Sequence, residues 1–152
     1  MRKLVAFDMD GVLVDTVSSW VHVHRRFGVN NDHSLEAYLR GEIDDREFIR
    51  RDIALWKRAD PDVTSDMIRG MLADAPLMNE AAELIAGLRR IGFRTAIVSA
   101  GIDLLSERVA EELGMDLQFA NGLCADGDGR LTGEGVFRVR LMEKGRTVEE
   151  AA

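Results

Sequence analysis

The sequence predicts an α/β fold built on a parallel, Rossmann-like sheet, and two kinds of segment support this class. Apolar runs at residues 4–7 and 94–98 show no alternation, which is typical of strands buried on both faces, and a third short run covers residues 117–120. Apolar residues at helical spacing precede the second of these runs, at residues 81–88, and lie between the second and the third, at residues 102–113. Strands that alternate with helices in this way form parallel sheets with helical crossovers.

The stretch between the first two predicted strands departs from this rhythm, because it contains helical patterns only. Ile49, Ile53 and Trp56 recur on one face of a helix, for which Asp44 or Asp45 is the expected N-cap. We therefore expect a helical cap domain at residues 16–74, inserted into a discontinuous core domain at residues 1–15 and 75–152.

Small and polar residues mark further boundaries along the chain. Asn79 is the expected N-cap of a helix that Gly92 ends, and Gly114 ends the helix after it. The segment 121–141 is expected to form a β-hairpin that turns over residues 126–129.

The composition describes an ordinary folded domain and restricts its partners. Hydrophobic residues make up 46% of the 152 residues and charged residues 31%, which suits one compact core and excludes a disordered chain. The net charge of −7 argues against nucleic acid or an anionic membrane as the main partner, and no apolar run has the length of a membrane span. Cys124 is the only cysteine, so no disulfide forms within the chain, and a cytoplasmic location is expected.

Two aspartates follow the first predicted strand directly. In an extended backbone Asp8 and Asp10 project to the same side, while Met9 turns away. Two carboxylates about 4 Å apart repel by roughly 4 kcal/mol at an effective dielectric near 20, so such a pair usually serves a cation, a shared proton or catalysis. Ser99 follows the second strand, and the carboxyl ends of neighbouring parallel strands are where such sheets bind ligands. The pattern predicts a site with a nucleophile, an acid and a hydroxyl donor.

These residues resemble the motifs of the haloacid dehalogenase superfamily. Residues 8–13 resemble its first motif, residues 98–101 its second, and Lys144 is placed like the lysine of its third. Within the superfamily, residues 119–121 and 129–133 and the early helical insertion are similar to those of phosphoserine phosphatases. The resemblance implies a phosphatase of a small phosphorylated metabolite, with a Rossmann-like core and a small helical cap.

The resemblance also implies a role for each residue. Asp8 would attack phosphorus and become an aspartyl phosphate, and Asp10 would act as general acid and then as general base. Ser99 would donate to a phosphoryl oxygen, Lys144 would neutralise negative charge, and Mg²⁺ would bind Asp8 and the backbone carbonyl of Asp10. Further substrate contacts are expected from Gly11, Ala100 and Gly101.

Phosphoserine phosphatases hold the substrate amine with an acidic residue and its carboxylate with a cap arginine. The matching positions here are Val17 and Asp52, so the neighbouring Arg50 and Arg51 are the candidates to bind a substrate carboxylate. Phosphate monoester is therefore a better supported substrate class than phosphoserine. A phosphotransferase or phosphomutase of the same superfamily, or a non-catalytic phosphate-binding module, is the alternative.

The resemblance also implies parts that this sequence does not contain. The superfamily carries a fourth, glycine-aspartate motif beyond the lysine, which supplies another metal carboxylate, and a strand that pairs with the first strand. The sequence ends at Ala152, before such a motif. The first strand is therefore expected to leave an open edge that favours self-association. Three alternatives follow: the chain is a fragment, a homodimer partner or second chain completes the site, or activity is impaired.

Overall fold

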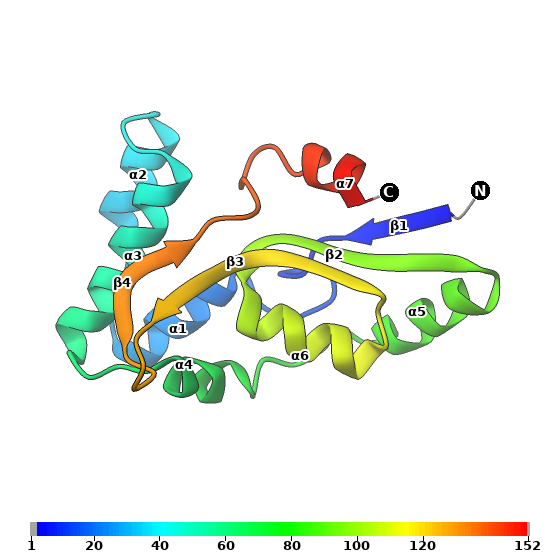
Figure 1. Cartoon of the computed structure of the whole chain (residues 1–152), viewed down its shortest axis with the longest axis horizontal. Coiled ribbons are helices and arrows are strands. Elements are labelled where there is room, and N and C mark those ends of the chain that lie inside the picture. Colours follow the sequence, from blue (N-terminus) through cyan, green and yellow to red (C-terminus); the bar gives the residue numbers. More distant parts are fainter. Residues whose placement is uncertain (1–2, 152) are drawn as a thin grey trace.

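The computed structural model describes residues 3–151, and this part of the chain forms a four-stranded sheet flanked by helices (Figure 1). The strands lie in the order β1 (Lys3–Phe7), β2 (Phe93–Ile102), β3 (Leu117–Ala125) and β4 (Leu131–Val136). β1 and β3 each pair in parallel with β2, whereas β4 runs antiparallel to β3. The predicted α/β class with a mainly parallel sheet is confirmed. Residues 1, 2 and 152 of the predicted core domain lie outside the described residues.

The two first strands differ in burial, although their sequences look alike. Ala96, Ile97 and Val98 of β2 are buried, as expected for a strand between two neighbours. The prediction that residues 4–7 are fully buried is wrong, because these residues are only half-buried. β1 lies at the edge of the sheet, and among residues 3–151 its only paired strand is β2. An edge position leaves one side of a strand without a neighbour.

The segment between β1 and β2 contains the helices α1 (Ser19–Phe27), α2 (Asp32–Leu39), α3 (Asp45–Ala59) and α4 (Ser65–Leu72). Asp44 is the N-cap of α3, and its carboxylate accepts a hydrogen bond from the backbone N–H of Glu47 at 2.9 Å. Ile49, Ile53 and Trp56 are buried on one face of α3, as their spacing predicts. α3 packs against α1, α2 and β4.

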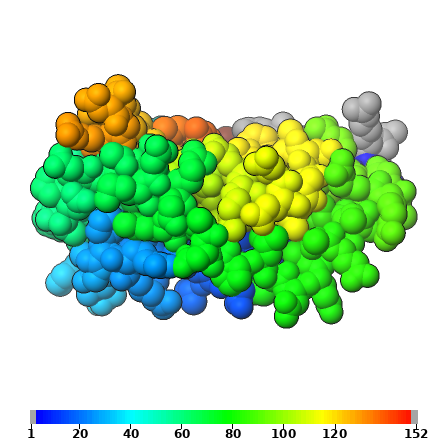
Figure 2. Space-filling model, turned by 90° about the horizontal axis from the view of Figure 1, so that it is seen from below, coloured from blue at the N-terminus to red at the C-terminus, as the bar shows by residue number. Residues whose placement is uncertain are grey.

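The helices α5 (Ala81–Arg90) and α6 (Asp103–Leu113) lie in the connections between the parallel strands. α5 packs against β2, and α6 packs against both β2 and β3. They lie on the same side of the sheet as α1 and α4, and these helices form much of the face seen in Figure 2. A short helix α7 (Gly145–Ala151) lies on the other side in Figure 1. Within residues 3–151, no helix has the length and apolar character needed to cross a membrane.

The predicted start of α5 at Asn79 is wrong by one residue. Glu80 is the N-cap, with a left-handed φ of 69°, and its carbonyl accepts the first helical hydrogen bond from Leu84 at 2.9 Å. Its side chain makes no capping hydrogen bond, so residue type gave no signal for this boundary. The expected ends are better placed, since Gly114 is the left-handed C-cap of α6 and Gly92, at φ 86°, follows α5.

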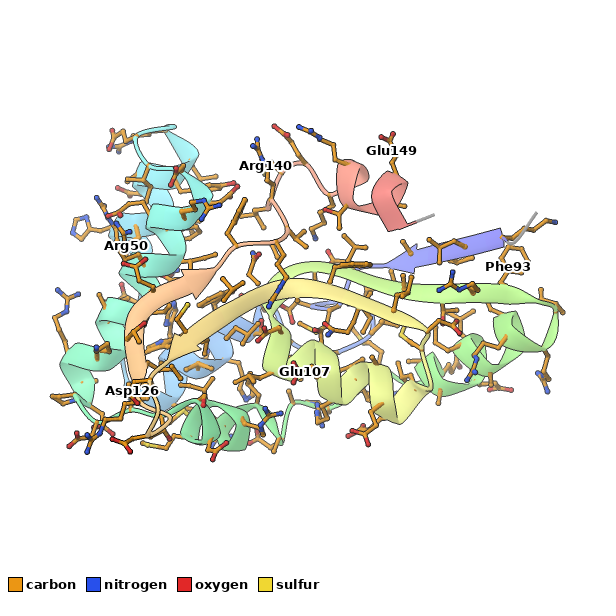
Figure 3. The ribbon with its side chains drawn as sticks, in the orientation of Figure 1. Arg50, Phe93, Glu107, Asp126, Arg140 and Glu149 are labelled. Carbon is orange, nitrogen blue, oxygen red and sulfur yellow. The ribbon has the colours of Figure 1, made fainter. Side chains whose placement is uncertain are left out.

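The predicted β-hairpin forms from β3 and β4. Its first arm is continuous with the predicted strand at residues 117–120, so β3 is one long strand instead of two short ones. At the turn, labelled in Figure 3, the Asp126 carboxylate accepts hydrogen bonds from the backbone N–H groups of Asp128 at 2.9 Å and Arg130 at 3.0 Å. Residues 137–141, also assigned to the hairpin, lie beyond the end of β4.

Candidate active site

The loop after β1 places two carboxylates at the wall of one cavity. Met9 is fully buried, and its carbonyl accepts hydrogen bonds from the N–H groups of Leu13 and Val14 at 2.9 and 3.0 Å. With Met9 anchored in the core, Asp8 and Asp10 both line the cavity, as expected from the alternation of side chains along an extended backbone. The loop then reverses at Gly11, whose φ of 75° suits glycine.

Ser99 lies next to these carboxylates, although it does not follow β2 as predicted. The strand continues through Ser99 to Ile102, with an irregular register between Val98 and Ile102. The Ser99 hydroxyl oxygen accepts a hydrogen bond from the backbone N–H of Gly101 at 3.0 Å, so its hydrogen is available for a ligand oxygen. Because Phe7 pairs with Ile97, the ends of β1 and β2 meet at this cavity.

Lys144 reaches the same cavity from the far end of the chain. Its ammonium group donates a hydrogen bond to Oδ2 of Asp8, with side-chain exposures of 29% for Lys144 and 36% for Asp8. The pair is therefore partly screened by water but remains within reach of a bound ligand. Together, Asp8, Asp10, Ser99, Ala100, Gly101 and Lys144 line one cavity of about 160 Å³.

Asn121 forms hydrogen bonds to the segment that leads to Lys144, a role that the sequence did not predict. Its amide nitrogen donates to the carbonyls of Ala100 at 3.3 Å and Val139 at 2.9 Å. Its amide oxygen accepts from the N–H groups of Arg138 at 2.8 Å and Val139 at 2.9 Å. The side chain is 2% exposed, so these contacts tie the end of β2 to the chain leading to Lys144. Asn121 lies in the middle of β3, and the resemblance of residues 119–121 to phosphoserine phosphatases singles out this stretch without indicating the contacts that its side chain makes.

Arg50 and Arg51 do not lie in this cavity. Both are exposed; Arg50 pairs with Glu134 at 3.1 Å and Arg51 with Glu47 at 3.0 Å. In Figure 3 Arg50 lies near the left edge of the molecule, whereas β1 lies on the right. The reason is helical periodicity, because Asp52 shares the buried face of α3 and the two arginines project outward. The structure therefore does not bring them to the site, and Gly11 serves the turn without lining the cavity.

Asp10 is more buried than Asp8 and has different hydrogen-bond partners. Its Oδ2 accepts hydrogen bonds from the backbone N–H of Ser19 at 2.9 Å and from the Ser19 hydroxyl at 3.0 Å. Its Oδ1 is buried and has no hydrogen-bond partner among residues 3–151. Burial raises the pKa of Asp10 above its ordinary value, and the negative charge of Asp8 raises it further, against the lowering effect of Ser19 and Lys144. Ser19, the first residue of α1, is a contact that sequence patterns missed.

Gly101→Ala is expected to destabilise the protein through this contact. A Cβ at Gly101 would lie 2.7 Å from Ser19 Oγ, 2.8 Å from Asp10 Oδ2 and 2.8 Å from Met9 Cε, so these side chains would have to move. We expect the free energy of unfolding, measured by urea denaturation, to fall by about 1–3 kcal/mol. Gly70→Ala is the matched control, because nothing lies within 4 Å of its added Cβ and alanine favours the helix. Equal stability of Gly101→Ala and the wild-type protein would contradict the packing described.

A second cavity of about 300 Å³ adjoins the first. The two cavities share the wall residues Val17, Ser18, Trp20, Ala100 and Leu141, so a ligand in one can extend into the other. The larger cavity reaches between α1, α2 and α3, and the Trp20 indole N–H donates to the Ala100 carbonyl at 3.0 Å at their boundary.

The fold and the site together define a Rossmann-like α/β protein with an acidic site at the carboxyl ends of its parallel strands. Residues 2–140 match the haloacid dehalogenase-like hydrolase family, and the chain belongs to this family.

Named relatives agree with this assignment. The chain is 33% identical to a phosphoserine phosphatase of Archaeoglobus fulgidus over 154 residues, covering 99% of this chain and 43% of that protein. It is 30% identical to a phosphoserine phosphatase of Wolinella succinogenes, covering 87% of this chain and 62% of that protein. A solved structure of a phosphoserine phosphatase with a phospho-aspartyl intermediate analogue superposes with a TM-score of 0.80 at 27% identity, over 99% of this chain and 71% of that one. The chain thus spans about half the length of the first two relatives.

Proposed function

We propose that the protein hydrolyses a small phosphate monoester through a phosphorylated Asp8. The observation that carries this proposal is the single cavity in which Asp8 and Asp10 meet Ser99 and Lys144. The relatives named phosphoserine phosphatase support the same reaction class, and so does the similar solved structure, which is of a phosphoserine phosphatase with a phospho-aspartyl intermediate analogue.

The reaction would proceed in two balanced steps. In the first, an oxygen of Asp8 bonds to phosphorus while the ester bond breaks, and Asp10 gives its proton to the leaving alkoxide. In the second, water attacks phosphorus, Asp10 takes the water proton, and the bond between phosphorus and Asp8 breaks to release phosphate. Burial raises the pKa of Asp10, which favours the protonated form that the first step requires.

Ser99 and Lys144 would bind the phosphoryl group during both steps. The Ser99 hydroxyl can donate to one phosphoryl oxygen, and the Lys144 ammonium can bridge Asp8 and another. Lys144 would also reduce the repulsion between the Asp8 carboxylate and the negatively charged substrate. Phosphoryl transfer depends mainly on such positioning and charge stabilisation.

The site also suits the Mg²⁺ ion expected for this family. Within residues 3–151 no group of three or more His, Cys, Asp or Glu residues is arranged to hold a metal. The ligands would therefore be the Asp8 carboxylate and the backbone carbonyl of Asp10, with water in the remaining positions. The Asp8 side chain is 36% exposed at the cavity wall, so its carboxylate can reach an ion bound there. Mg²⁺ commonly binds one or two carboxylates and keeps several waters, and it would supply positive charge next to the phosphoryl oxygens.

The helices of residues 16–74 would act as a cap over the core formed by residues 1–15 and 75–152. α1 and α3 contribute one wall of the larger cavity, and β2, β3 and Leu141 contribute the other. A substrate held between these walls would be shielded from bulk water during transfer to Asp8.

Release of phosphate from 4-nitrophenyl phosphate tests the proposal. We expect turnover with Mg²⁺ and its loss after chelation with EDTA, with activity restored when Mg²⁺ is added back. Transfer of the phosphoryl group to an added alcohol without net phosphate release would identify a phosphotransferase instead. Binding of inorganic phosphate without any turnover in the presence of Mg²⁺ would overturn the proposed hydrolysis.

A further inference from the structure

The larger cavity is where the leaving group of a phosphate ester would lie, given the proposed function. A phosphoryl group held by Asp8, Ser99 and Lys144 fills the smaller cavity, and the continuous wall through Trp20 and Ala100 leads into the larger one. The chemistry of the larger cavity therefore determines which alcohol the ester contains.

Most of this cavity has an apolar lining. Val17 and Val21 contribute from α1 and the residues before it, Leu35 from α2, and Phe48 and Ile49 from α3. Such walls favour a ligand with an aliphatic or aromatic portion, because removing apolar surface from water stabilises the complex by about 25 cal/mol per Å². A cavity of about 300 Å³ accommodates a group the size of a substituted ring.

Asp52 introduces a carboxylate into this apolar lining. It is 3% exposed, and the Asn31 amide nitrogen donates to its two oxygens at 3.0 and 3.2 Å. His24 Nε2 lies 3.5 Å from Oδ2 of Asp52, too far for a well-formed hydrogen bond. The Trp56 indole N–H donates to His24 Nδ1 at 2.7 Å, so the histidine hydrogen is on Nε2 and points toward Asp52. Asp52 is held in place but keeps acceptor capacity.

The cavity contains acidic groups without a cation to balance them. Asp45 also contributes to the lining, whereas among the described residues none of those lining this cavity is Arg or Lys. A buried carboxylate is costly unless a positive charge pairs with it. A carboxylate on the ligand would meet two acids here, whereas an ammonium group would find a partner in Asp52.

We infer that the preferred substrate is the phosphate ester of an apolar alcohol that carries an amine and no carboxylate. Asp52 is the specificity-determining residue that accepts the amine. Asn31 and His24 position its carboxylate. That the substrate is a phosphate ester rests on the proposed function. That it carries an amine rests only on the residues lining the larger cavity.

Three matched alcohols test the amine preference without any turnover. Tyramine, 4-ethylphenol and tyrosine share one ring and differ in the ammonium and carboxylate groups. We expect tyramine to bind about tenfold more tightly than 4-ethylphenol, and tyrosine to bind more weakly than tyramine, by calorimetry on the wild-type chain. Equal affinities, no binding of any of the three, or tightest binding of tyrosine would overturn the inference.

Asp52→Asn tests whether the Asp52 carboxylate is responsible for the preference for the amine. We expect this variant to bind tyramine and 4-ethylphenol with equal affinity, because the amide keeps the shape and loses the charge. Asp66→Asn, an exposed residue of α4, is the matched control and should retain the tenfold difference. If Asp52→Asn retains the tenfold difference as well, Asp52 does not recognise the amine.

Phosphorylated tyramine separates this inference from the proposed function. Phosphate release from phosphotyramine faster than from phosphotyrosine would support both. If the three alcohols bind in the expected order but no ester releases phosphate, the amine site is supported and the proposed hydrolysis is rejected. Fast release from phosphotyrosine and slow release from phosphotyramine would retain the hydrolase and reject the amine site.

Discussion

Asp8→Asn is expected to abolish phosphate release from 4-nitrophenyl phosphate while leaving the protein folded. The amide oxygen is a poor nucleophile, so the aspartyl phosphate would not form, and we expect turnover to fall by about 10³-fold or more. The substitution preserves the size of the side chain, and the amide oxygen can still accept the hydrogen bond from Met9 N–H, which is 2.8 Å long in the native protein. Initial rates at saturating Mg²⁺ measure the loss, and circular dichroism measures the fold.

Asp15→Asn is the matched control for this prediction. Asp15 lies in the same loop and undergoes the same loss of charge, but it is exposed and contributes to neither of the two adjoining cavities. Its variant should retain the wild-type rate. Retained turnover in Asp8→Asn would show that another group attacks phosphorus, and equal loss in both variants would indicate a general effect of charge.

The carboxylate pair could be predicted from sequence because its geometry is local. Asp8 and Asp10 directly follow β1 and both line the cavity, while the apolar Met9 between them is buried in the core, as the alternation of side chains predicts. The neighbouring position of Ser99 follows from a rule nearly as simple, since parallel strands expose their carboxyl ends at one edge. Each prediction needs only the backbone of one strand or the pairing of two.

The contacts that complete the site depend on tertiary packing. Asn121 ties distant segments together, and Ser19 binds Asp10 only because α1 begins beside the loop. Arg50 and Arg51 lie outside the cavity because the rotation of α3 depends on which face packs inward, and Asp52 occupies that face. Motif matching identified Lys144, but its contact with Asp8 also requires the chain held by Asn121.

Trp56→Ala is expected to cost about 3–5 kcal/mol in the free energy of unfolding, the largest effect on stability among the changes considered. Trp56 is fully buried, with its ring stacked on Trp20 at 5.5 Å and on Phe27 at 6.4 Å between centroids. Alanine would leave a cavity among these rings and would also remove the hydrogen bond to His24. Such a loss is a large fraction of the 5–15 kcal/mol typical of a domain, and urea denaturation measures it.

Trp56→Phe separates packing from hydrogen bonding at the same position. Phenylalanine retains most of the buried area but leaves His24 Nδ1 without its donor, so a smaller loss of about 1–3 kcal/mol is expected. Because Trp56 stacks on Trp20, and the Trp20 indole binds the Ala100 carbonyl at the boundary of both cavities, the alanine variant should also weaken tyramine binding. Wild-type affinity together with reduced stability would show that the aromatic stack supports the helices without shaping the cavity.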